Sequence, residues 1–473
     1  MYRLSLKYLR QWFHRDDRKP LILRGARQVG KTTLVRLFAD TEKLELIEVN
    51  MEDPQSFVAL LKNNQPQEIF ELLALERGLK TLLPEQTLIF FDEVQECPEI
   101  IPFLRYCHER AQSFRVICAG SLLEFSLGNV TTSFPVGRVE YMYLHPMSFD
   151  EYVFAVGGEG LFDKLNQYSL ERPLSSPVHE LLVQHFREYL ICGGMPAVVK
   201  AKAGGAGILE MERIKSSILE SFGSDFAKYS KYISNRPDVD LLNQIFEKLP
   251  NLIGKKITYS KVSQNETAAR VRKHIDFLEQ ALIIRRCKHT SAGAPPLRAG
   301  VNEKIFKLIL LDVGLLQTQL GVSIADIKSV ADVNKLAKGE LAEQFIGQQL
   351  LYLSADFIKP QLFHWSRTAR GSEAEVDYLI ELGGKIYPIE VKAGTSNTMR
   401  SLALLQAEKQ FPLAVRFYSG EVKKERRTIQ RGDTNFSYTL ISLPHYACEH
   451  IARLLRECDT AEISQTASTG ISK

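Results

Sequence analysis

The residues with the clearest chemistry lie between Gly25 and Thr32, where the sequence reads G-A-R-Q-V-G-K-T. The apolar run Leu21–Leu23 comes directly before this loop, and a helical pattern begins directly after it. A strand that enters a glycine-bounded loop and continues into a helix directs backbone N–H groups and the positive end of the helix toward one point, where they bind phosphate. The sequence therefore predicts a nucleoside triphosphate site, and we expect ATP with Mg²⁺.

Two side chains of this loop carry the most specific roles. Lys31 brings a mobile positive charge to the phosphates, and the hydroxyl of Thr32 is a ligand for Mg²⁺. A plain glycine turn is the alternative, but the strand before the loop and the helix after it argue against such a turn. The residues expected to surround the nucleotide are Gly25, Ala26, Arg27, Gln28, Val29, Gly30, Lys31, Thr32 and Thr33.

A second part of the same site follows the run Leu88–Phe91, which is apolar at every position and leads into Asp92 and Glu93. Such a run is typical of a central parallel strand that is covered on both faces. We expect Asp92 to hold Mg²⁺ through its water shell, and Glu93 to polarise the attacking water as a general base. A strand that merely ends in an acidic turn is the alternative, and the phosphate loop upstream favours hydrolysis over it.

A further strand is expected over residues 114–119, and Ser121 follows it where a small polar side chain can contact the γ-phosphate. Downstream, Gly137 and Arg138 precede another strand-like run at residues 139–144. We therefore include Ser121 among the residues that bind the cofactor.

These motifs resemble those of the AAA-plus-type ATPases of bacteria and archaea that carry a C-terminal domain of unknown function. The resembling stretches are G-A-R-Q-V-G-K-T-T-L, F-F-D-E-V-Q, A-G-S, V-G-R-V and L-H-P-M-S-F-D-E-Y. The resemblance implies a sensor role for Ser121. It also implies that Arg138 is an arginine finger in the site of a neighbouring subunit, and hence a dimer or a ring. An ordinary surface arginine is the alternative interpretation of Arg138.

Length and composition are those of a multidomain globular protein. The 473 residues suffice for about three domains. Hydrophobic residues make up 45% and charged residues 25%, and no apolar run approaches the roughly 20 residues of a membrane span. Seven cysteines without a C-x-x-C pair indicate reduced thiols, so we expect a cytoplasmic protein. The formal charge of +4 is too small to indicate nucleic-acid binding by itself.

We expect an α/β chain of four parts and a tail. The segments are a P-loop, AAA-plus-like ATPase core at 1–150, a helical lid or linker at 151–235, a winged-helix-like part at 236–290, a PD-(D/E)XK nuclease-like domain at 291–458 and a disordered tail at 459–473. The tail is rich in serine and threonine and lacks apolar periodicity.

Residues 257–262 and 266–281 read like a helix pair, and residues 281–286 like a strand that follows it. This order resembles a winged helix, in which the second helix enters a major groove and basic side chains bind phosphates. A solvated helix face and a protein–protein module are the alternatives. The basic side chains expected on the outer side of the second helix are Arg270, Arg272, Lys273 and His274.

A second set of chemically active residues lies near the C-terminus. Asp377 lies in one strand-like run, and Glu390 and Lys392 lie in the next, after a turn at Gly383-Gly384. Residues i and i+2 of a strand share a face, and an antiparallel neighbour can place Asp377 beside them. Two carboxylates on one sheet face bind Mg²⁺, and a lysine there can orient or deprotonate the attacking water.

This pattern resembles the PD-(D/E)XK nuclease superfamily, with Glu343, or else Glu340, as the acid of a preceding helix. The resemblance implies that Glu343, Asp377 and Glu390 hold the metal and that Asp377, Glu390 and Lys392 are catalytic. Val376 stands where a Pro-Asp motif would have proline. A salt-bridged sheet face without catalysis is the alternative.

Other basic and aromatic residues near this pattern leave two interpretations open. Trp365, Arg367 and Arg370 either line a nucleic-acid groove or form a solvated rim, and the basic run Lys423–Arg427 reads as a loop.

The sequence as a whole predicts an ATPase whose nucleotide state controls DNA binding or metal-dependent DNA cleavage by the C-terminal domains. The alternative is an ATP-switched DNA-binding or protein-scaffold module whose nuclease-like domain is inactive. A remodeller of proteins would need an aromatic pore loop, and none is identifiable in the sequence.

Overall fold

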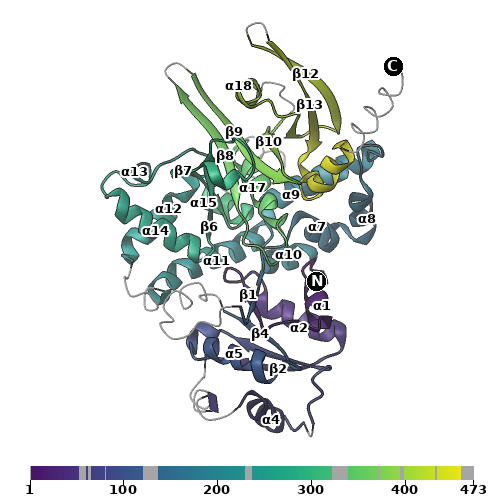
Figure 1. Cartoon of the computed structure of the whole chain (residues 1–473), viewed down its shortest axis with the longest axis vertical. Coiled ribbons are helices and arrows are strands. Elements are labelled where there is room, and N and C mark those ends of the chain that lie inside the picture. The colour runs from purple at the N-terminus through teal and green to yellow at the C-terminus, as the bar shows by residue number, and fades with distance from the viewer. Residues whose placement is uncertain are drawn as a thin grey trace.

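The computed structural model describes residues 2–52, 60–61, 65–79, 81–120, 137–229, 237–321, 339–369, 372–394, 399–431 and 434–459. The N-terminal third of the chain forms one end of the molecule, the C-terminal strands form the other, and helices lie between them (Figure 1). All seven cysteines are buried as free thiols.

The N-terminal sheet has five strands in the order β2-β3-β4-β1-β5, and all its pairings are parallel. Successive strand residues point to opposite faces, so α1 and α2 pack on one face while α4 and α5 pack on the other. The elements are α1 (Leu6–His14), β1 (Leu21–Arg24), α2 (Lys31–Glu42), β2 (Glu45–Asn50), α4 (Pro66–Glu76), β3 (Thr87–Asp92), η1 (Val94–Glu96), α5 (Ile100–Arg110), β4 (Arg115–Ala119) and β5 (Glu140–Tyr143).

Helices fill the middle of the molecule. They are α7 (Phe149–Tyr152), η2 (Val153–Gly157), α8 (Glu159–Gln167), α9 (Ser176–Cys192), α10 (Pro196–Ala203), α11 (Ile208–Tyr229), α12 (Val239–Lys248), η4 (Leu249–Asn251), α13 (Tyr259–Val262) and α14 (Ala268–Gln280). Helix α9 ends at Cys192 and is capped by Gly193, whose φ is 70°. A Cβ at Gly193 would lie 2.0 Å from Oδ1 of Asp312, so only glycine fits between α9 and the C-terminal half.

The C-terminal sheet has eight strands in the order β12-β13-β11-β10-β9-β8-β6-β7. Helix α18 packs on one face, and α17 and η6 pack on the other. The elements are β6 (Ile284–Thr290), η5 (Leu297–Gly300), β7 (Val301–Leu310), α15 (Val313–Gln319), α17 (Glu340–Tyr352), β8 (Leu362–Ala369), β9 (Ser372–Leu382), β10 (Lys385–Val391), α18 (Arg400–Lys409), β11 (Leu413–Tyr418), β12 (Lys423–Arg431), β13 (Thr434–Pro444) and η6 (His445–His450).

The predicted boundary at residue 290 falls inside this sheet. Strand β6 pairs antiparallel with β7 and parallel with β8, so the strand expected to follow the helix pair belongs to the C-terminal sheet. One continuous apolar core also runs from Met147 to Cys458, through the expected lid, middle and nuclease-like parts. The three segments therefore form a single packed half of the molecule.

Two other expectations need correction. The basic run Lys423–Arg427 is not a loop; it begins strand β12, because its backbone pairs with β13. Trp365 is buried in the core beneath α18, so it does not line an open groove, whereas Arg367 pairs with Glu408 and keeps a partly exposed side chain. Arg370 lies outside the described residues, as does all of the expected tail except Asp459.

Candidate nucleotide site and C-terminal carboxylate cluster

The loop between β1 and α2 has the backbone that its glycines predict. Gly30 caps α2 with φ 92°, in the left-handed region. A Cβ at Gly25 would lie 2.7 Å from the carbonyl oxygen of Leu144, so the loop packs too closely against the end of β5 for any side chain. The ammonium of Lys31 lies within this loop and donates to the carbonyls of Gly25 and Ala26, both at 3.0 Å.

The two oxygen groups predicted to bind Mg²⁺ lie together. Although β4 separates β3 from β1 in the sheet, the hydroxyl of Thr32 donates to Oδ2 of Asp92 at 2.5 Å. The backbone N–H of Glu93 donates to the other oxygen of Asp92 at 3.0 Å. Burial raises the pKa of Asp92 more than the Thr32 bond lowers it. A hydroxyl and a carboxylate are donors that Mg²⁺ accepts, so Thr32 and Asp92 fit that ion.

Glu93 has a left-handed backbone with φ 51°, and its Oε2 accepts from Nε2 of Gln95 at 2.6 Å. It lines a cavity of about 380 Å³ together with Lys31 and Thr32. Burial lowers the pKa of Lys31 to about 8, against the opposing effect of Glu93 and Asp92. The cavity is lined by Arg3, Arg27, Gln28, Gly30, Lys31, Thr32, Thr33, Leu34, Leu37, Glu93, Pro196, Ala197 and Lys200.

Sequence reasoning missed two cations of this cavity. Arg3 is buried, donates to the carbonyls of Val29 at 3.1 Å and His145 at 2.7 Å, and pairs with Glu151 at 3.2 Å. No local sequence pattern indicates a role for Arg3, because its partners are distant in sequence and contact it only in the folded chain. Lys200 lies four residues after Pro196 on α10, and this helical spacing would have placed both on one face.

The tip of the phosphate loop also contacts the C-terminal half. Arg27 forms an ion pair with Asp225 on α11, and Nε2 of Gln28 donates to Oγ of Ser221 at 3.0 Å. Asp225 is buried. The loop is therefore tied to the middle of the molecule at two places.

The predicted C-terminal residues come together as expected. Tyr378 pairs with Ile389 in the antiparallel ladder, which places Asp377 next to Glu390. Oδ2 of Asp377 accepts from the backbone N–H of Val391 at 2.7 Å. Lys392 follows directly after β10, and its ammonium contacts Oε1 of Glu390 at 2.6 Å.

A second lysine lies at this place, and no local sequence pattern indicates it. Lys307 on β7 is fully buried, and its ammonium contacts Glu343 at 2.5 Å, Glu375 at 2.6 Å and Asp377 at 3.6 Å. Burial acts to lower the pKa of Lys307, but these carboxylates outweigh it and raise the pKa well above its usual range. Glu343 is thus the helix acid that joins this group.

Burial raises the pKa values of two acids in this group, Glu343 and Glu390. Burial raises the pKa of Glu343 to about 8, although Lys307 opposes the shift. Burial and then Asp377 raise the pKa of Glu390 to about 7. Among the described residues, no set of three or more histidine, cysteine, aspartate or glutamate side chains is arranged to hold a metal ion.

Residues 17–153 match a family model described as an AAA domain. This part of the chain is an AAA-type, nucleotide-binding ATPase domain. Two further models, each described as a domain of unknown function, match residues 183–326 (DUF8612) and residues 338–445 (DUF4143). No curated protein matches the chain. The AAA model covers the phosphate loop, Asp92 and Glu93, and it ends close to the predicted end of the ATPase core.

Solved structures of the Aeropyrum pernix ORC2 protein show a distant likeness. The structure with ADPNP and ADP is 12% identical, with 69% of this chain and 96% of that chain covered and a TM-score of 0.32. The ADP form is 13% identical over the same shares of the two chains, with a TM-score of 0.30. Likeness at these scores carries no information about the partners of this chain.

The predicted arginine finger, Arg138, lies away from the described cavity. Arg138 precedes the N-terminal end of β5, whereas the phosphate loop follows the C-terminal end of the parallel strand β1. Its side chain is 46% exposed and pairs with Glu109 at 3.2 Å. Arg138 is therefore far from its own loop and accessible from outside. Ser121 lies outside the described residues.

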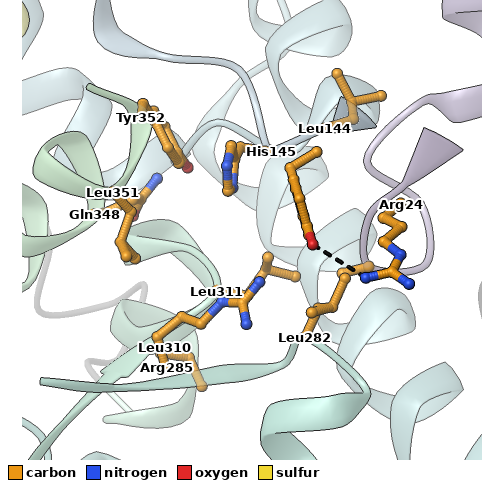
Figure 2. Close-up of a pocket in the computed structure, with 12 residues that line it drawn as sticks. Arg24, Leu144, His145, Leu282, Arg285, Leu310, Leu311, Gln348, Leu351 and Tyr352 are labelled. Carbon is orange, nitrogen blue, oxygen red and sulfur yellow. Dashed lines mark hydrogen bonds between the residues drawn. The ribbon is translucent and has the colours of Figure 1, made fainter. Parts of the chain in front are cut away.

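A small cavity lies between the AAA domain and the C-terminal half, and both polar and leucine side chains line it (Figure 2). Nη1 of Arg24 donates to the hydroxyl of Tyr143 at 3.0 Å on one side, while Arg285, Gln348 and Tyr352 approach from the other. Its volume of about 20 Å³ has room for a water molecule. Both halves therefore contribute polar and apolar side chains to this contact.

The outer side of α14 is only partly as predicted. Arg270 pairs with Asp238, and with Glu266 at 3.0 Å. His274 does not lie on the outer side; it is buried, and its ring bonds to the carbonyl of Arg270 at 2.8 Å. Arg272 and Lys273 line an open cavity of about 310 Å³.

In the described ranges, no helix combines the length and apolar character needed to cross a bilayer.

Proposed function

We propose that this chain hydrolyses ATP in its AAA domain and that the nucleotide state controls DNA binding by its C-terminal half. One observation carries the proposal: the nucleotide cavity is built by both halves. The phosphate loop and Glu93 form one part, and Pro196, Ala197 and Lys200 of α10 form the other. Helix α10 belongs to the C-terminal core through Val198 and Val199. Phosphates in the cavity therefore act on both halves at once.

In this proposal, Lys31 and the loop N–H groups bind the β- and γ-phosphates, and Thr32 and Asp92 hold Mg²⁺, which neutralises phosphate charge. Glu93 orients the attacking water and accepts its proton. Lys200 is close enough to the same cavity to respond to the γ-phosphate. Ser121 as a sensor remains a prediction, and so does Arg138 acting in a neighbouring subunit.

The order of elements supports a winged-helix role for the middle. Helices α12, α13 and α14 are followed by the β6–β7 hairpin, and Ile257 bridges to Phe306 on β7. Arg272 and Lys273 line the cavity on the outer side of α14. Basic side chains on such a helix bind DNA phosphates in a salt-dependent manner.

DNA binding can be measured by fluorescence anisotropy with ATP or ADP at several salt concentrations. We expect Arg272→Ala and Lys273→Ala each to weaken binding and to lower the salt slope by about 1, the loss expected for one phosphate contact. The matched control is Arg213→Ala, which removes an exposed, ion-paired arginine of α11. Absence of DNA binding at low salt in both nucleotide states would leave the protein-scaffold alternative.

Metal-dependent DNA cleavage is the second candidate function. The grouping of Asp377, Glu390 and Lys392 supports it, with Glu343 as a further acid. The test compares cleavage of single- and double-stranded DNA with Mg²⁺ or Mn²⁺ by the natural protein and by Asp377→Ala. The contacts of the Lys307 ammonium with Glu343 and Asp377 favour a catalytically inactive domain instead, because these carboxylates already face a cation.

A further inference from the structure

Lys307 contacts acidic side chains from two separate elements, α17 and β9. It lies on β7, in the strand sequence I-F-K-L-I-L, with no exposed side-chain surface. Its ammonium contacts Oε1 of Glu343 on α17 at 2.5 Å and Oε1 of Glu375 on β9 at 2.6 Å, with Oδ1 of Asp377 at 3.6 Å. A lysine enclosed in this way needs charged partners, and these three carboxylates supply them.

The carboxylate oxygens of Glu343, Glu375 and Asp377 are also the ligands that a divalent ion would need at this place. Carboxylate oxygens suit Mg²⁺ or Mn²⁺ in kind, since these ions take hard oxygen ligands at about 2.0–2.2 Å. Here the oxygens of Glu343 and Glu375 already face an ammonium, and Oδ2 of Asp377 accepts from the backbone of Val391. A divalent ion among them would lie beside a buried positive charge, where repulsion is strong. With Lys307 in place, these residues do not fit a metal.

We propose that the ammonium of Lys307 is the resident cation of this cluster and takes the place that a divalent metal ion would need. The C-terminal domain of the natural protein therefore binds no metal at Glu343 and Asp377. The ammonium also joins β7 to α17 and β9, so the cluster fastens the β6–β7 hairpin to the rest of the sheet. This inference concerns metal binding and holds whether or not the chain binds DNA.

The first experiment compares Mn²⁺ binding by the full chain and by Asp377→Asn. Electron paramagnetic resonance of free Mn²⁺, in the absence of nucleotide, counts the ions bound by each protein. We expect equal counts, because Asp377 holds no metal, and any ion bound near Thr32 and Asp92 is the same in both. One Mn²⁺ more in the natural protein than in Asp377→Asn would overturn the proposal.

The second experiment removes the ammonium and keeps its volume with Lys307→Met. We expect this variant to gain one Mn²⁺, because Glu343, Glu375 and Asp377 lose their cation and Oε2 of Glu390 has no hydrogen-bond partner within the described structure. Thermal melting should also show that Mn²⁺ takes the place of the removed ammonium. Mn²⁺ should raise the melting temperature of Lys307→Met and leave that of the natural protein unchanged.

Two controls keep the result specific. Lys307→Met combined with Asp377→Asn should lose the added ion, and Lys307→Arg, which keeps the charge, should gain none. A folded Lys307→Met protein that gains no Mn²⁺ would overturn the proposal. If Lys307→Met does not fold, even with Mn²⁺ present, the comparison with Asp377→Asn still decides.

Discussion

Glu93 lies beside Lys31 and Thr32 in one cavity, where its carboxylate accepts a hydrogen bond from Gln95. Glu93→Gln keeps the shape of this side chain and removes its basicity. We expect ATP binding to persist while hydrolysis slows by about 10²–10⁴-fold, the usual contribution of a general base. Nucleotide titration and phosphate release measure the two effects separately. Lys31→Ala is the contrasting variant and should abolish binding itself. Equal rates for natural and Glu93→Gln protein would remove Glu93 from the reaction.

His445 predicts how stability depends on pH. It is buried, it stacks on Phe186 with ring centres 4.6 Å apart, and burial lowers its pKa to about 4. Between about pH 4 and 6.5 the unfolded chain binds a proton there that the folded chain does not. The free energy of unfolding should therefore fall as pH is lowered through this window, by up to about 1.4 kcal/mol per pH unit.

The variant His445→Phe keeps the stacking and cannot titrate. Urea unfolding across the same window should show a shallower pH dependence for His445→Phe than for the natural protein. The exposed Asn166 on α8, which has no titratable group, provides the control, since Asn166→Ala should leave the dependence unchanged. Parallel curves for natural and His445→Phe protein would contradict the assignment.

The site residues that could be predicted from sequence all stand in local patterns. Asp92 ends an apolar strand, and Glu390 and Lys392 are two apart in another, so their positions followed from strand geometry. Lys307 and Arg3 could not be found in that way. A lysine within an apolar strand gives no sign of its partners, because Glu343 and Glu375 reach it from distant parts of the chain.

At the scale of elements, α11 is the direct link between the phosphate loop and the C-terminal half. Its Asp225 pairs with Arg27, and its Ser221 bonds to Gln28. Nucleotide that moves the loop should therefore stiffen or loosen this helix. We expect ATP to slow amide hydrogen exchange in α11, and Asp225→Asn to lose much of that protection.

Hydrogen exchange with and without ATP measures this coupling segment by segment. The matched control is Ser224→Ala on the same helix, where the Ser224 hydroxyl donates to the carbonyl of Glu220 within α11. The same ATP-dependent protection in Asp225→Asn and natural protein would show that the ion pair does not transmit the nucleotide state.

The elements themselves followed well from periodicity, and their assignment to domains did not. The strand expected near residue 284 exists, but its partner β8 begins at Leu362. No local pattern states which strand pairs with which across such a separation. The same apolar strand fits a small wing or a larger sheet equally well, because a strand in either place buries at least one of its faces.

At the scale of the whole molecule, Arg138 predicts assembly. It lies outside its own site, so it acts on nucleotide only if another subunit presents a phosphate loop to it. ATPase activity per subunit should then rise with protein concentration. Mixing Arg138→Ala with Glu93→Gln subunits should restore part of the activity that each lacks, because mixed interfaces pair an intact Arg138 with an intact Glu93.

Arg105→Ala is the matched control for this mixing test, because Arg105 pairs with the same Glu109 at 3.0 Å. It should keep full activity and gain nothing when mixed. A monomeric protein with normal turnover would contradict the role of Arg138.

The core that runs from Met147 to Cys458 bears on the order in which a newly made chain folds. The AAA sheet can pair as soon as its own strands leave the ribosome. Helix α10 belongs to that core and packs against η2, α9 and α11, so it has all these neighbours only after residues 208–229 have been made. A nascent chain therefore has its phosphate loop early and the α10 side of the cavity later, so the proposed ATP site is completed only after the AAA sheet has been made.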